Sequence, residues 1–244
     1  MLSHIDSSLN PRIEKHPNVS LITFSYNKDV QDFSGLRSAL SITDQITSIN
    51  LSKRDWRVAM VAAGINPSLA CVMCELAKVK SGEVILDPFC GAGVIPISAI
   101  MYYKAKTAIA SDISGSAIDC VYKNALAAKI GKNLIIIRSD IKRLKLGQHS
   151  VDKIITNPPF GIRVGSHEDN LSIYNNLFIL SERVLKPNGL LVVLTQEINL
   201  LQSTASKFPK FTKIKDLELF HGGLRPHIFV YKLLGIKNIA TNLS

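Results

Sequence analysis

The stretch Asn157-Pro158-Pro159-Phe160 carries an unusual set of chemical groups. The Asn157 side-chain oxygen and the Pro158 carbonyl are two acceptors in a segment whose backbone the prolines restrict. Two fixed acceptors suit an exocyclic amino group on an aromatic ring, which has two hydrogens to donate. Such an amine is a weak nucleophile, and holding both hydrogens aims its lone pair at an electrophile. The motif therefore predicts group transfer to a base amine by positioning and electrostatic help, with Phe160 as the stacking surface.

Polar side chains also follow three earlier apolar runs, at the points where strands are expected to end. The series is Asp87, Asp112, Asp140 and Asn157. In an open α/β sheet the ligand lies at the carboxyl ends of the strands. Any one of these aspartates could simply cap a helix. Four such groups at consecutive strand ends indicate a ligand site.

A glycine-containing turn, "DPFCGAG", follows the first of these strands. Gly91 and Gly93 allow the backbone to approach a ligand closely because they have no Cβ. The turn lacks the last glycine of a dinucleotide fingerprint, since Pro96 occupies that place, and the chain has no phosphate loop. The turn is therefore expected to serve a ligand that needs no phosphate site.

The residues at the next two strand ends are suited to bind an adenosine. Asp112 is placed to accept the ribose hydroxyls, and Asp140 to accept from the adenine amino group. Ile113 and Ile141 flank the purine ring. An adenosine without phosphates fits S-adenosylmethionine, whose amino-acid end would lie at the glycine turn, near Asp87.

Strands and helices alternate through most of the chain. Strands are expected at 83–87, 107–112, 133–140, 151–157, 190–196, 213–220 and 227–234, and helices at 69–78 with Ser68 as the cap, 94–103, 116–130, 171–185 and 199–206. The continuous apolar strands predict a sheet covered on both faces. The last two strands are joined too tightly to be parallel. The fold class is therefore α/β, a seven-stranded and mainly parallel sheet with an antiparallel strand in the C-terminal hairpin, as in Rossmann-like class I methyltransferases.

Residues 1–60 are polar and mixed, with short strands expected at 19–26 and 46–52, and form a separate extension before a domain at 61–244. The N-terminus does not resemble a secretory signal, and no apolar run is long enough to predict a membrane span. The four cysteines, Cys71, Cys74, Cys90 and Cys120, are expected to be reduced thiols of a cytoplasmic protein. Neither the Cys71/Cys74 pair nor the histidines show metal-ligand spacing, so no metal is expected.

The net charge of +10 favours a polyanionic partner. The basic residues form three local groups: Lys53, Arg54 and Arg57; Arg138, Lys142, Arg143 and Lys145; Lys207, Lys210, Lys213 and Lys215. Any one group could be an ordinary solvated surface.

Four segments, "LDPFCGAGVIPISA", "SDISGSAIDCVYKNALAAKI", "ITNPPFGIRVGS" and "HGGLRPHIFVYKLL", together resemble the THUMP-associated tRNA guanosine methyltransferases. That family methylates the 2-amino group of guanine, and the resemblance covers about residues 50–235. It implies that Asp87, Phe89, Gly91, Asp112, Asp140 and Asn157 hold S-adenosylmethionine, and that Asn157, Pro158 and Phe160 hold the guanine. It also implies that "INPSLA" (65–70) lies against the donor.

The resemblance is weaker at the N-terminus, where the family usually carries a ferredoxin-like piece and a THUMP domain. Residues 1–60 are expected to be a remnant of that region. The tRNA would then dock on the basic surface of the catalytic domain or on another chain, and a small activator subunit is a further expected partner.

Two other functions remain open from the sequence. The asparagine–diproline motif is shared with amino methyltransferases that act on adenine in DNA or rRNA, or on a protein glutamine. A non-catalytic subunit with a methyltransferase fold is the other alternative, although it would have no need of both a donor site and an acceptor loop.

Overall fold

The structure is a computed structural model that describes residues 53–62, 64–159, 167–219 and 225–235. The chain divides into two units, residues 1–53 and 54–244, and only the second is described below. The strands expected at 19–26 and 46–52 fall outside the described residues, and the predicted boundary at residue 60 stays a prediction.

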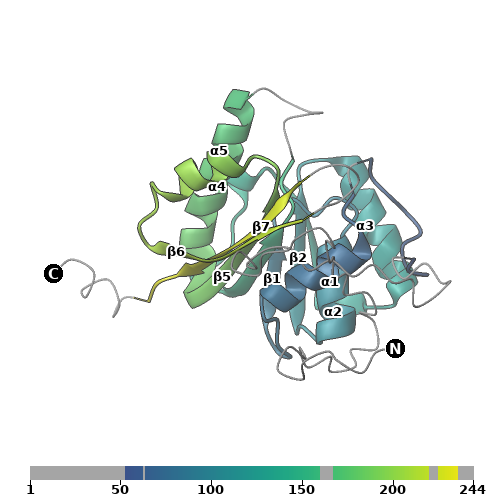
Figure 1. Cartoon of the computed structure of the whole chain (residues 1–244). Helices are drawn as coiled ribbons and strands as arrows, with labels where there is room; N and C mark the ends of the chain where they lie inside the picture. The colour runs from purple at the N-terminus through teal and green to yellow at the C-terminus, as the bar shows by residue number, and fades with distance from the viewer. Residues whose placement is uncertain (1–52, 63, 160–166, 220–224, 236–244) are drawn as a thin grey trace, which may run out of the picture. The chain divides into compact units, whose positions relative to one another are not determined.

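A seven-stranded sheet forms the centre of the second unit, in the order β3-β2-β1-β4-β5-β7-β6 (Figure 1). Its strands are β1 (Val84–Asp87), β2 (Thr107–Asp112), β3 (Leu134–Arg138), β4 (Val151–Thr156), β5 (Leu185–Thr195), β6 (Phe211–Glu218) and β7 (His227–Leu233). The first five pair in parallel, and β7 runs antiparallel to both β5 and β6. The predicted sheet and its antiparallel hairpin strand are confirmed.

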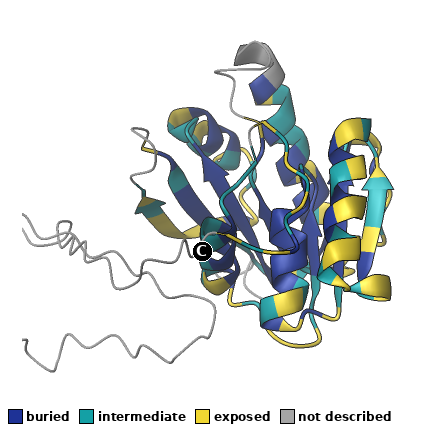
Figure 2. Ribbon diagram, turned by 90° about the vertical axis from the view of Figure 1, so that its right-hand side faces the viewer, coloured by how far each residue is buried: buried dark blue, intermediate teal, exposed yellow. Residues whose placement is uncertain are grey.

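Helices cover both faces of this sheet. They are α1 (Pro67–Leu76), α2 (Val94–Tyr103), α3 (Gly115–Ala128), α4 (His167–Val184) and α5 (Ile198–Ala205), with short 3₁₀ turns η3 (Gly131–Asn133) and η4 (Ile141–Arg143). In Figure 1, α1, α2 and α3 lie on one side of the sheet and α4 and α5 on the other. Figure 2 shows that burial concentrates in the strands and on the helix faces that meet them.

Several element boundaries differ from the sequence prediction: for example, α4 begins at His167 rather than 171, and β6 spans Phe211–Glu218 rather than 213–220. Asn66, rather than Ser68, caps α1, because its side chain accepts from the Ser68 N–H and Pro67 fits the first helical position. The strand β3 ends at Arg138, two residues before Asp140. The strand β5 begins at Leu185 instead of 190, because Leu185 pairs with Val151 before an irregularity that shifts the register, so that Lys153 pairs with Leu190.

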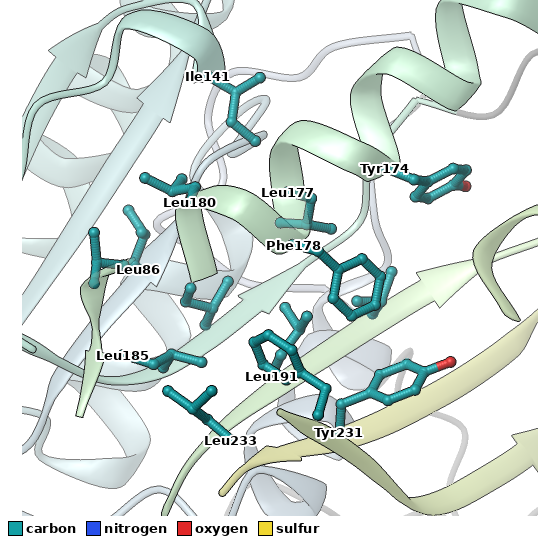
Figure 3. Close-up of a cluster of buried hydrophobic side chains, with 14 of the residues drawn as sticks. Leu86, Ile141, Tyr174, Leu177, Phe178, Leu180, Leu185, Leu191, Tyr231 and Leu233 are labelled. Atoms are coloured by element: carbon teal, nitrogen blue, oxygen red, sulfur yellow. The ribbon is translucent and has the colours of Figure 1, made fainter. Parts of the chain in front are cut away.

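The hydrophobic core between α4 and the sheet is built around Phe178 (Figure 3). Its ring stacks on Phe208 at a centroid distance of 5.2 Å and meets the edges of Phe211 and Tyr231 at 5.3 and 5.4 Å. The Tyr174 hydroxyl is buried and hydrogen-bonds Thr195 at 2.6 Å. These contacts fix α4 against β5, β6 and β7, and so fix the N-terminal half of α4 beside the carboxyl ends of the strands.

A buried side chain, Asn124 on α3, helps to hold the segment before α1 in place, together with the bond from buried Trp56 to the Tyr102 hydroxyl. The Asn124 amide oxygen accepts from the Ala59 N–H at 2.8 Å, and its amide nitrogen donates to the carbonyls of Ala59 and Ala92, both at 2.9 Å. Ala92 lies in the glycine turn. Asn124 therefore holds two loops together, and both loops reach the site described below.

Replacing Asn124 by alanine is expected to lower the free energy of unfolding by about 2–4 kcal/mol, because three backbone groups lose their partner. Chemical denaturation of the variant measures this change. Lys123→Ala, on the exposed side of the same helix, is the matched control and should change stability by less than about 0.5 kcal/mol. Equal stability of the two variants would contradict the anchoring role.

Candidate active site

A cavity of about 470 Å³ opens at the carboxyl ends of β1, β2 and β4. The polar residues at the expected strand ends predict a ligand at this place. The residues predicted from the sequence that line it are Asp87, Phe89, Gly91, Asp112, Ile113, Asp140, Ile141, Asn157 and Pro158. One predicted contact does not line it: Gly93 packs against Val121, and a Cβ at Gly93 would lie 3.0 Å from a Val121 methyl. Phe160 falls outside the described residues.

The three aspartates at the cavity share one local geometry. Each accepts a backbone N–H from two residues further on: Asp87 from Phe89 at 3.2 Å, Asp112 from Ser114 at 2.9 Å, and Asp140 from Lys142 at 2.9 Å. Such Asx turns fix the carboxylate at the point where the chain leaves the strand edge. Asp140 does this as the N-cap of η4, not as the last residue of a strand. Of the three, only Asp140 is a helix cap, since Gly93 and Ser114 are the N-caps of α2 and α3, and all three aspartates line the cavity.

Asp112 also braces the glycine turn. Its second carboxylate oxygen accepts from the Gly91 N–H at 2.9 Å, across from β2 to the turn after β1. Gly91 has a φ of +51°, and a Cβ there would lie 3.3 Å from a Val61 methyl. A side chain at this position would therefore strain the backbone and crowd the cavity wall. Each oxygen of Asp112 retains lone pairs for a ligand hydroxyl.

Asp87 is the most deeply buried charged group of the site, with 1% of its surface exposed. Its Oδ1 accepts from the Thr156 hydroxyl at 2.7 Å, which joins the end of β1 to the end of β4. Burial raises the pKa of Asp87 to about 7, against the opposing effect of the hydrogen bonds from Thr156 and the Phe89 N–H. The carboxyl is thus poised to ionise near neutral pH when a cation approaches.

Asn157 presents an unsatisfied acceptor. Its side-chain Oδ1 is buried and has no hydrogen-bond partner within the described part of the chain. A buried acceptor without a partner costs free energy of about 1–3 kcal/mol, and such groups are rare in folded proteins. Asn157 and Pro158 both line the cavity. The geometry therefore places an amide oxygen that needs a donor at the wall of a cavity that could hold one.

Several cavity residues were not singled out from the sequence. Ser172 and Ile173 come from α4, and Val61 and Gly64 from the segment before α1. Thr156 was also missed, although it directly precedes the asparagine motif. No local pattern marks the α4 and Val61 positions, because only the packing of distant segments brings them to the cavity. Ile65, in the segment expected to lie against the donor, does line it.

The remaining chemistry-bearing residues do not build a rival site in the described ranges. Cys71, Cys74 and Cys90 are buried, and all four cysteines are free. Burial raises the pKa of Cys74 and Cys90 well above the ordinary value. No group of three or more metal-ligating side chains occurs among the described residues. No described helix is long and apolar enough to cross a membrane.

A family model described as UPF0020, RMKL-like, methyltransferase domain matches residues 54–227. The chain belongs to this family. This RMKL-like methyltransferase domain is 31% identical to the human U6 snRNA (guanine-N(2))-methyltransferase THUMPD2, over 70% of this chain and 33% of that protein. It is 28% identical to the tRNA (guanine(6)-N2)-methyltransferase of Thermus thermophilus, over 78% of this chain and 56% of that enzyme.

The solved structure of TrmN from Thermus thermophilus has the same fold as the RMKL-like domain, with a TM-score of 0.68 and 27% identity. The similarity covers 80% of this chain and 56% of the TrmN chain. The resemblance drawn from the four sequence segments is confirmed by these relatives. The chain spans a third of the length of the human relative and somewhat more than half of the bacterial one.

Proposed function

We propose that this protein transfers a methyl group from S-adenosylmethionine to the exocyclic 2-amino group of a guanosine in tRNA. The observation that carries the proposal is the buried, unpartnered Oδ1 of Asn157 at the wall of the cavity. This unpartnered oxygen supports a methyl-accepting amine that donates hydrogen bonds to it, beside a pocket whose residues suit an adenosine. Relatives that share this domain are named as guanine-N2 methyltransferases of RNA.

The residues of the cavity fit the donor. Gly91 leaves the wall open for a ligand, Asp112 has acceptor capacity for ribose hydroxyls, and the turn uses Oδ1 of Asp140, which leaves its second carboxylate oxygen for a ligand. Ile113 and Ile141 both line the cavity and supply apolar surface for a purine. When bound, S-adenosylmethionine supplies a methyl carbon attached to a positively charged sulfur. Asp87, when ionised, favours the positive charge of that ligand.

The acceptor is activated by position. The Asn157 amide oxygen and the Pro158 carbonyl accept the two hydrogens of the 2-amino group, and the nitrogen lone pair then points away from them, into the cavity. The Thr156 hydroxyl bond to Asp87 ties this acceptor segment to the donor half of the site. As the carbon–sulfur bond of the donor breaks, the neutral thioether S-adenosylhomocysteine would be the leaving group, and the nitrogen that gains the methyl group becomes acidic. A strong base is therefore unnecessary, because this nitrogen gives its proton to water. The rate enhancement comes from fixed geometry and fixed dipoles.

Methylation of RNA by the purified protein tests this function. Transcribed tRNA and U6 snRNA are incubated with labelled S-adenosylmethionine, digested to nucleosides and analysed by mass spectrometry. N2-methylguanosine in tRNA is the expected product. Methylated adenosine, or methylated glutamine in a protein substrate, would contradict the proposal, and so would N2-methylguanosine in U6 snRNA alone. Absence of calorimetric binding of S-adenosylmethionine would favour a non-catalytic subunit.

Donor binding is expected to depend on pH through Asp87. Below about pH 7 the buried carboxyl of the free protein is protonated, so binding a cationic donor must first remove a proton. The affinity for S-adenosylmethionine should therefore fall by up to about tenfold for each pH unit below 7 and level off above it. Calorimetric titrations from pH 5 to pH 8 measure this profile.

Three variants sharpen this pH experiment. Asp87→Asn should remove the pH dependence. Thr156→Val removes a hydrogen bond that stabilises the ionised carboxylate, so the midpoint should move to higher pH. Thr156→Ser keeps the hydroxyl and should leave the midpoint in place. A flat profile in the unmodified protein would show that Asp87 does not contact the charge of the donor.

The same pKa shift makes a prediction for the free protein. Because the folded pKa is raised from 3.8 to about 7, the contribution of Asp87 to stability is fully present below pH 3.8 and is lost as pH rises to about 7. Asp87→Asn should remove that loss, which urea denaturation in this pH window would detect.

Partners beyond tRNA belong to the proposal as well. We expect tRNA to dock either on the basic surface of this domain or on a separate RNA-binding chain, and an activator subunit to raise turnover, in the cytoplasm. Turnover of tRNA by the purified chain that such partners do not increase would contradict their role.

A further inference from the structure

Three basic residues lie on the turn η4 and just after it, directly after cavity residues in the chain. Lys142, Arg143 and Lys145 are all exposed. Lys142 itself lines the cavity, together with Asp140 and Ile141 immediately before it. The turn η4 packs against α4, the helix that supplies Ser172 and Ile173 to the same cavity. Lys142 therefore lies at the cavity wall, and Arg143 and Lys145 are exposed on the segment that leads away from it along α4, where the Leu144 carbonyl accepts from Arg183 at 2.7 Å.

Five basic residues of the described surface form ion pairs with carboxylates. The ion pairs found there are Lys153–Glu83, Lys186–Asp152, Lys210–Glu182, Lys213–Asp216 and Arg225–Glu218. In the described ranges, neither Lys142, Arg143 nor Lys145 pairs with a carboxylate. The neighbouring Asp140 directs one oxygen at the Lys142 backbone N–H instead. Lys142, Arg143 and Lys145 thus keep three positive charges available to an anionic partner.

We propose that Lys142, Arg143 and Lys145 form a phosphate-binding rim that holds the RNA strand next to the target guanosine. This inference rests on the proposed function, because a base that reaches Asn157 must leave its stack and bring its backbone to the cavity mouth. Backbone phosphates carry most of the electrostatic affinity of proteins for nucleic acids. Unpaired cations at the mouth supply that affinity without reading sequence. A guanidinium and two ammonium groups suit phosphate oxygens.

The experiment measures RNA binding as a function of salt. In the triple variant Lys142→Ala, Arg143→Ala, Lys145→Ala, the slope of log affinity against log salt should become shallower by about 2–3. Affinity for tRNA near physiological salt should fall by about 10- to 100-fold. The rate at saturating tRNA should change far less, because the acceptor segment is untouched. Since Lys142 lines the cavity, affinity for S-adenosylmethionine is measured as well, and Arg143→Ala, Lys145→Ala serves as a second variant that leaves the cavity wall intact.

The chain offers a matched control for charge. Lys80, Lys106 and Lys132 are exposed and precede β1, β2 and β3, so they lie at the opposite, amino-terminal edge of the sheet. Replacing these three by alanine removes the same charge and should change the salt slope by less than about 1. Equal effects in both triple variants, or no effect in the rim variants, would overturn the proposal. Failure of the proposed function would look different: the unmodified protein would bind RNA with a salt-dependent affinity and form no N2-methylguanosine.

Discussion

Replacing Asn157 by alanine is expected to lower the rate of methyl transfer by about 10²–10³-fold and to leave the affinity for S-adenosylmethionine within about twofold. Removing a single fixed group that contacts the reacting atoms typically has an effect of this size. The Asn157 oxygen is buried and unpartnered, so its interaction with the acceptor amine is not in competition with another hydrogen bond. Single-turnover methylation of tRNA, with donor binding measured by calorimetry, separates the two effects.

The conservative variant Asn157→Asp is the control for this experiment. Its carboxylate keeps an acceptor at the same place, so it should retain more activity than the alanine variant. A purely structural role of Asn157 would lower donor affinity and stability along with the rate. Near-normal turnover of Asn157→Ala would show that the acceptor assignment is wrong.

Replacing Asp112 by alanine is expected to weaken S-adenosylmethionine binding by about 30- to 100-fold, equivalent to roughly 2–3 kcal/mol. Two causes add. The variant removes the predicted acceptor for the ribose, and it leaves the Gly91 N–H, which Asp112 now satisfies at 2.9 Å, without its partner. The glycine turn would then no longer be held in the shape that leaves room for the ligand. Calorimetric titration with S-adenosylmethionine measures the loss.

A second variant distinguishes these two causes. Asp112→Asn keeps one side-chain oxygen, which is able to accept from the Gly91 N–H or the Ser114 N–H but carries no charge. An intermediate loss of donor affinity is expected. If the alanine variant bound the donor as well as the unmodified protein, Asp112 would have to be regarded as a brace of the turn alone.

Much of the fold was predictable because each strand can be recognised from the apolar residues of its own short segment. The runs that became β1 and β2 are centred on consecutive apolar residues, 84–86 and 108–110, which indicates burial on both faces. The errors came at element ends. The prediction extended β3 to Asp140 because the polar residue was taken as the strand end, whereas the chain leaves the sheet after Arg138 and Asp140 caps η4. Polar residues mark where a segment ends only to within a few residues, since both a strand end and a helix cap accept them.

The sequence by itself determined the chemistry of the site: the asparagine–diproline motif, the glycine turn and the three aspartates are all visible in one dimension, because each needs a particular residue type at a particular turn. Tertiary structure alone decided which of these groups are linked. Thr156 hydrogen-bonds Asp87 from 69 positions away along the chain, and Asn124 joins the segment before α1 to the glycine turn. The physical reason is that hydrogen bonding and burial depend on distances in space. The pKa of Asp87, the unpaired Asn157 oxygen and the uncompensated cations of η4 exist only once neighbouring strands and α4 have packed around them.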